Sequence, residues 1–79
     1  MVLWVFAESS SQARRWLADN APGERATIWS GGEAARIAGL RFADGDRVVV
    51  VGDIGVPAER VVSRCVQASP GQISLVRAV

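Results

Sequence analysis

Four consecutive valines, Val48 to Val51, mark a segment in which the hydrophobic pattern shows no alternation. Successive side chains of a strand face opposite sides of a sheet, so a strand without polar positions must be covered on both faces. A second segment of this kind spans residues 2–6. Both segments predict central strands of a parallel sheet.

The remaining apolar positions predict helices and shorter strands. Ser9 to Gln12 has the capping-box pattern, and the helix that it opens ends at Pro22-Gly23. A second capping-box pattern, Ser30 to Glu33, predicts a short helix that ends at Gly39 and carries Ala34, Ala35, Ile37 and Ala38. Pro57 suits the start of a third helix, whose apolar stripe comprises Ala58, Val61, Val62, Cys65 and Val66. Strands are also predicted over 26–29 and 72–77, and Asp44-Gly45-Asp46 predicts a turn.

The predicted elements alternate as βαβαβαβ, which favours a parallel sheet within a single α/β domain over residues 1–79. Placing the two doubly apolar strands at the centre gives the strand order 2-1-3-4. We therefore predict a small three-layer, flavodoxin-like or Rossmann-like fold with a mostly parallel four-stranded sheet. The first helix should cover one face, and the other two helices should cover the opposite face.

Length and composition narrow the functional classes. A 79-residue chain has a marginal core, yet 49% of its residues are hydrophobic. Two explanations stay open: helices cover both faces of the sheet, or a partner or a second copy buries part of the apolar surface. No apolar run approaches the ~18 residues of a membrane span, and no signal peptide is recognisable, so the expected location is the cytoplasm. The chain has one Cys, no His and no Lys. We expect a non-enzymatic protein without a cofactor or a metal cluster.

The carboxyl ends of the first and third strands form the switch point of such a sheet, where ligands usually bind. Glu8, Ser9 and Ser10 follow the first strand, and Asp53 follows the third. The carboxylates could hold Mg²⁺, and the amides near the serines could hold a small anion. The favoured interpretation is structural: the serines cap the helix, and Asp53 accepts hydrogen bonds from its own turn.

Residues 48–57 resemble the phosphoacceptor segment of response-regulator receiver domains, in which a buried strand ends in Asp and a Pro follows four residues later, as Asp53 and Pro57 do here. The likeness is confined to these ten residues. The acidic pair of those domains is reduced to Glu8, and their lysine has no counterpart. We interpret the resemblance as coincidental.

All nine basic residues are Arg, while the net charge is only +1. Arg60 and Arg64 lie one helical turn apart on the polar side of the third helix, and could contact nucleic-acid phosphates. A solvated helix face is the favoured interpretation, because so small a net charge gives no general attraction to nucleic acid.

The first strand with its Ser/Gln-capped helix, the Ile28-Trp29-Ser30 segment and the stretch Arg36 to Arg41 before the valine strand resemble small uncharacterised proteins of actinobacteriophages (mycobacteriophage type). The resemblance implies a phage accessory protein that acts in the host cell. We therefore expect an interaction protein that forms a homo-oligomer or binds a host protein. The expected interaction surface comprises Trp29, Arg60, Arg64, Val66, Ile73 and Leu75.

Overall fold

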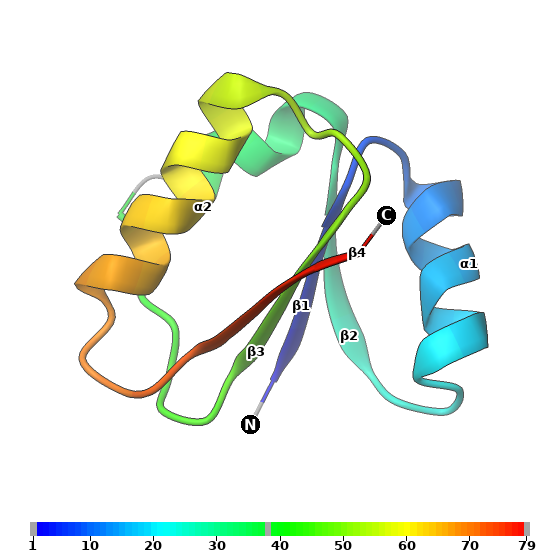
Figure 1. The fold of residues 1–79 in the computed structure, drawn as a ribbon, viewed down its shortest axis with the longest axis horizontal. Coiled ribbons are helices and arrows are strands. Elements are labelled where there is room, and N and C mark those ends of the chain that lie inside the picture. Colours follow the sequence, from blue (N-terminus) through cyan, green and yellow to red (C-terminus); the bar gives the residue numbers. More distant parts are fainter. Residues whose placement is uncertain (1, 38, 79) are drawn as a thin grey trace.

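A computed structural model describes residues 2–37 and 39–78. Four strands, β1 (Leu3–Ala7), β2 (Ala26–Ser30), β3 (Arg47–Val51) and β4 (Ser74–Ala78), build one sheet. Two α-helices, α1 (Ser10–Asn20) and α2 (Val56–Ala68), and a 3₁₀ helix, η1 (Gly31–Ile37), connect them (Figure 1). Among the described residues, no helix has the length and apolar character needed to cross a membrane.

The sheet confirms the predicted topology. Its strand order is β2-β1-β3-β4, and all three neighbouring pairs are parallel. The valine strand β3 and the apolar strand β1 are central, as their lack of alternation predicts. The partly polar β4 lies at an edge, which the sequence also predicts.

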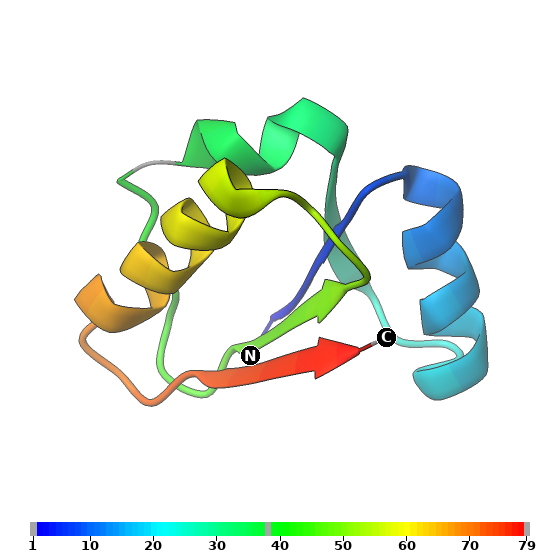
Figure 2. The same ribbon diagram turned by 45° about the horizontal axis from the view of Figure 1, so that its top comes forward.

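The three layers follow from the two faces of the central strands. Leu3, Val5 and Val49 point to the face that α1 covers, where Ala13 is fully buried. Phe6 and Val50 belong to the opposite face, which α2 and η1 cover (Figure 2). On that face α2 contributes its predicted stripe, of which Ala58, Val62 and Cys65 are buried.

The second predicted helix is present over Gly31–Ile37, where it takes the 3₁₀ form, and Gly31 begins it at φ +56°. Two consecutive glycines disfavour the α-helix because they lose much backbone entropy there. The Gly31 amide donates to the Glu8 carbonyl oxygen at 2.9 Å, which ties this end of η1 to the end of β1. Ala38, which the sequence places in the same helix, lies outside the described residues.

The segment after η1, over residues 39–46, has no helix or strand and inserts the Phe42 side chain into the core. Phe42 is 1% exposed, and its ring meets the Trp4 ring edge-on with centroids 5.3 Å apart. The Phe42 amide donates to Ser69 Oγ at 2.8 Å, and that hydroxyl donates to the Cys65 carbonyl oxygen at 2.6 Å. These two hydrogen bonds link the end of α2 to the segment around Phe42.

Asp46 is the buried carboxylate of the fold, although the sequence indicated only a turn there. Its side chain accepts hydrogen bonds from the Val2 amide at 2.8 Å, the Trp4 indole Nε1 at 3.0 Å and the Ala43 amide at 2.9 Å. Burial raises the pKa of Asp46, but these hydrogen bonds lower it by a larger amount, so the pKa lies below its ordinary value. The ionised carboxylate joins the start of β1 to the turn before β3.

Candidate functional site

At the switch point, the side chains of Ser9 and Asp53 form the local hydrogen bonds that the structural interpretation predicts. Ser9 is the N-cap of α1, and its Oγ accepts a hydrogen bond from the Gln12 backbone amide at 3.2 Å. Asp53 Oδ1 accepts the Gly55 amide at 2.8 Å, within its own turn. One acceptor oxygen of each of these side chains is therefore already hydrogen-bonded to a nearby backbone amide.

Gln12 does not behave as a capping-box partner. A side-chain carbon at Gly52 would lie only 2.6 Å from Gln12 Nε2, so the Gln12 amide group is packed against the turn after β3. Gly52 has φ +69°, a conformation that L side chains rarely adopt, and it leaves room for this contact. The space between the two switch-point turns is thus filled in part by Gln12.

The other predicted ligand residues of the switch point lie at the surface, since Glu8, Ser10 and Asp53 are exposed. Over residues 2–37 and 39–78, no group of three or more His, Cys, Asp or Glu side chains is arranged to hold a metal ion.

The arginines are distributed over opposite layers. Arg60 and Arg64 are exposed on α2, whereas Arg14 and Arg15 are exposed on α1, across the sheet. Two further arginines are paired: Arg47 with Glu24 at 2.7 Å, and Arg77 with Glu59. This distribution divides the positive charge between layers instead of concentrating it on one face.

The expected interaction residues fall into two groups. Val66, Ile73 and Leu75 are partly buried and pack against the core cluster beneath α2, so they lie along β4 and the helix beside it. Trp29 is likewise partly buried and packs against the same core from the β2 edge, with its indole Nε1 buried. Its place on an interaction surface stays a prediction.

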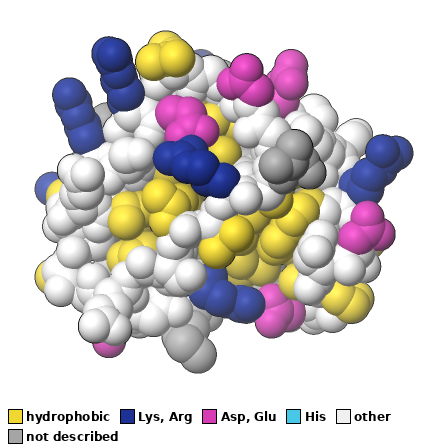
Figure 3. Space-filling view, viewed as in Figure 1, with side chains coloured by type: hydrophobic (Ala, Val, Ile, Leu, Met, Phe, Trp, Pro, Cys, Tyr) yellow, Lys and Arg dark blue, Asp and Glu magenta, His cyan; other side chains and the backbone are white. Residues whose placement is uncertain are grey.

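Among the described residues of the strands, Val76 of β4 is the large hydrophobic residue that is exposed. Val76 is 50% exposed, and it pairs with Val49 on the α1 side of the sheet. On that side α1 packs on β1, β2 and, less extensively, β3. Figure 3 shows hydrophobic side chains in two areas on either side of the path of β4, one towards α2 and the other towards α1. An apolar surface therefore borders both sides of this edge strand.

The hydrogen bonds between β3 and β4 show which backbone groups of β4 point away from the sheet. The Ser74 amide donates to the Asp46 carbonyl oxygen, and the Ala78 carbonyl oxygen accepts the Gly52 amide. Residues 74, 76 and 78 therefore direct their amides and carbonyls toward β3. Because these directions alternate along a strand, Leu75 and Arg77 direct theirs outward from the sheet.

Comparison of the chain with protein-family models, with curated proteins and with solved structures found no match. The resemblance to actinobacteriophage proteins stays a prediction.

Proposed function

We propose that this protein is a non-enzymatic interaction module that self-associates through the β4 edge. The carrying observation is the half-exposed Val76 on an edge strand bordered by apolar side chains. Edge strands present unpaired amides and carbonyls that can pair with another strand. Proteins usually protect such edges with prolines, bulges or charged side chains.

The protection of β4 is weak. Its five residues include no proline, and its one charged side chain, Arg77, is engaged by Glu59 of α2. The other edge strand, β2, differs because α1 packs along it and its Trp29 ring is turned into the core. A second copy is therefore expected at β4 rather than at β2.

A two-fold axis perpendicular to the sheet would pair two β4 strands antiparallel and keep equivalent faces on the same side. With the axis at Val76, each Leu75 lies opposite the partner copy's residue 77. The outward amides and carbonyls of both residues then form the hydrogen-bonded pairs. The two Val76 residues form the non-hydrogen-bonded pair, in which side chains approach most closely. This register also keeps the two Arg77 side chains apart.

The size of the molecule is compatible with such an interface. The accessible surface of the protein is 4981 Å². A specific interface that buries ~800 Å² on each partner would cover about a sixth of it. The strand edge supplies backbone hydrogen bonds, and the flanking apolar side chains supply the hydrophobic contribution.

Disulfide cross-linking tests the register. In a Val76→Cys variant, the two thiols of a dimer would lie on residues about 4.5 Å apart at Cα, within the range of disulfides. We expect mild oxidation to give a covalent dimer that reduction reverses. The matched control is Thr27→Cys, at an exposed position of the β2 edge. The unmodified protein, whose Cys65 is buried, controls for the native thiol.

Cross-linking at position 76 but not at position 27, together with a dimeric mass by light scattering, supports the proposal. Equal cross-linking of both variants, or a monomeric mass at millimolar concentration, contradicts it. A monomer that binds only an unrelated protein at β4 would also exclude self-association.

A further inference from the structure

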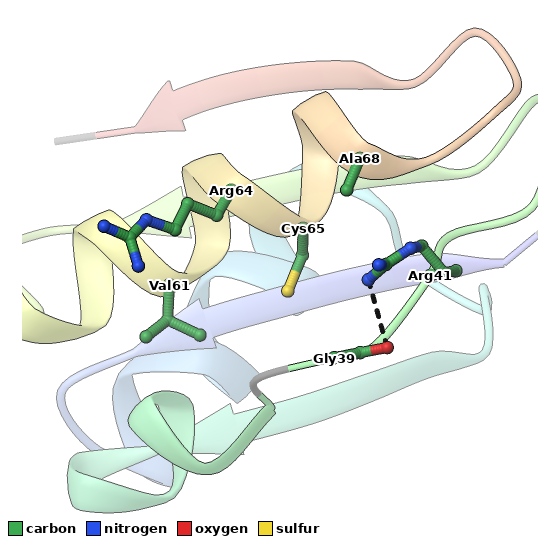
Figure 4. A pocket seen from close by; sticks show the side chains of 6 residues that line it. All are labelled: Gly39, Arg41, Val61, Arg64, Cys65 and Ala68. Atoms are coloured by element: carbon green, nitrogen blue, oxygen red, sulfur yellow. Dashed lines mark hydrogen bonds between the residues drawn. The ribbon is translucent and has the colours of Figure 1, made fainter.

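A pocket of about 260 Å³ lies between α2 and the segment that follows η1. The described residues that line it are Gly39, Arg41, Val61, Arg64, Cys65 and Ala68 (Figure 4). It belongs to the helical layer, not to the β4 edge or to the switch point. Occupation of this pocket is therefore a separate question from self-association.

The wall that α2 provides is apolar. Val61, Cys65 and Ala68 follow one another along the helix, and in Figure 4 the Val61 and Cys65 side chains point into the space below it. Cys65 Sγ donates to the Ile37 carbonyl oxygen at 3.4 Å, so the thiol is already engaged and serves as part of the wall. From Val61 to Ala68 the helix rises about 10 Å, which sets the length of this wall.

The charges of the pocket are both positive and stand at its two ends. Figure 4 shows Arg64 extending toward the Val61 end and Arg41 reaching in from the Ala68 end, with Cys65 between them. No acidic side chain is among the described residues of the lining. The ion pairs found within the described residues are those of Arg47 and Arg77, so Arg41 and Arg64 take part in neither.

Arg41 has donors to spare for an anion. Its Nη1 donates to the Gly39 and Leu40 carbonyl oxygens, both at 3.1 Å, which anchors the side chain to its own segment. A guanidinium has five N–H donors, and its remaining donors match the geometry of a carboxylate. Arg64 offers the same chemistry from an exposed position on α2.

We propose that this pocket binds an aliphatic dicarboxylate, with its chain along Val61, Cys65 and Ala68 and one carboxylate near each arginine. The volume has room for roughly eight or nine water-sized groups, which favours a chain of roughly eight carbons. A neutral aliphatic molecule would leave both cations without a partner, and a monocarboxylate would satisfy only one.

The test is a titration of the full chain with suberate, followed by ¹H–¹⁵N NMR shifts. Octanoate and 1-octanol, which have the same chain length with one carboxylate and with none, are the comparison ligands. We expect the largest shifts at the amides of Val61, Cys65 and Ala68. Affinity should fall in the order suberate, octanoate, octanol.

The arginines are tested one at a time. Arg41→Gln and Arg64→Gln should each weaken suberate binding about fivefold, the effect of a partly exposed ion pair. Arg60→Gln is the matched control, because Arg60 lies one turn from Arg64 on the same helix and does not line the pocket. Its affinity should stay unchanged.

Equal affinity for suberate and octanol would overturn the proposal. So would equal weakening by Arg60→Gln and Arg64→Gln, which would indicate general attraction of anions to α2. Suberate shifts confined to residues outside the pocket, or no shifts at millimolar suberate, would also overturn it.

Discussion

At the residue scale, the two partly buried tryptophans on the α2 face differ in how their indole groups are satisfied. Trp4 Nε1 donates to the Asp46 carboxylate, whereas Trp29 Nε1 is buried without a hydrogen-bond partner in the described part of the chain. A buried donor that is left unpaired costs about 1–3 kcal/mol. Replacing each ring by Phe removes the donor and a similar volume, so the comparison isolates the hydrogen bond.

We expect Trp4→Phe to lower the free energy of unfolding by about 1–3 kcal/mol more than Trp29→Phe does. The first change leaves the Asp46 carboxylate with one fewer donor, and the second removes an unpaired polar group. Urea unfolding followed by circular dichroism measures both variants. Equal losses would contradict the assignment of the unpaired donor.

Asp46 makes stability depend on pH in a defined direction. Its pKa is lower in the folded protein than in the unfolded chain, where the pKa of Asp is about 3.9. The ionised group therefore stabilises the fold above that pH, and the contribution is lost as the pH falls through the lower, folded-state pKa. Acidification should weaken the native protein for this reason.

We expect Asp46→Asn to lower the free energy of unfolding at pH 7 by about 2 kcal/mol, because it removes a charged acceptor of three hydrogen bonds. The variant should also show a smaller loss of stability between pH 6 and pH 2. Urea unfolding at several pH values measures both effects. Asp19→Asn, on the exposed face of α1, is the control, and an equal change there would argue against the role of Asp46.

At the element scale, the sequence predicted the strands and α-helices because their burial leaves a direct mark on it. The valines of β3 and the apolar run of β1 have no polar position, and α1 begins at the Ser9 cap that the capping pattern indicates. The 3₁₀ form of η1 and the buried state of Asp46 were not predictable. Both depend on contacts distant in sequence, such as the Glu8 carbonyl and the Trp4 indole.

Ser69 shows how one side chain links two elements. Its buried hydroxyl accepts a hydrogen bond from the Phe42 backbone amide and donates one to the Cys65 carbonyl oxygen. We expect Ser69→Ala to lower the free energy of unfolding by about 1–3 kcal/mol, because a buried amide loses its acceptor. Ser63→Ala within α2, the helix that Ser69 caps at its C-terminus, is the matched control, with an expected change within about 0.5 kcal/mol. Chemical denaturation compares the two variants, and similar losses would count against the link.

At the scale of the whole molecule, the sequence could place the switch point but not decide what its side chains do. Asp53 and Ser9 were correctly located, and the structure shows their oxygens bonded to neighbouring amides. The pocket between α2 and the segment after η1 was beyond sequence reasoning, since it needs Arg41 from an irregular segment beside Arg64 of a helix. The position of β4 at an edge of the sheet could be predicted from the sequence, because a partly polar last strand indicates a sheet boundary.

Self-association through β4 has a thermodynamic consequence for the entire fold. When the folded dimer dissociates on unfolding, mass action makes the melting temperature rise with protein concentration. We expect this rise for the unmodified protein. Val76→Arg should abolish it, because two arginines would face each other at the two-fold axis, where like charges repel. Thr27→Arg adds the same charge to the β2 edge, where Thr27 is exposed, and should retain the rise.

Differential scanning calorimetry over a hundredfold range of concentration measures the three proteins. A melting temperature independent of concentration in the unmodified protein, or loss of the dependence in Thr27→Arg alone, would place the interface elsewhere or remove it. If Val76→Arg alone loses the dependence, the β4 edge is the surface through which the molecules associate.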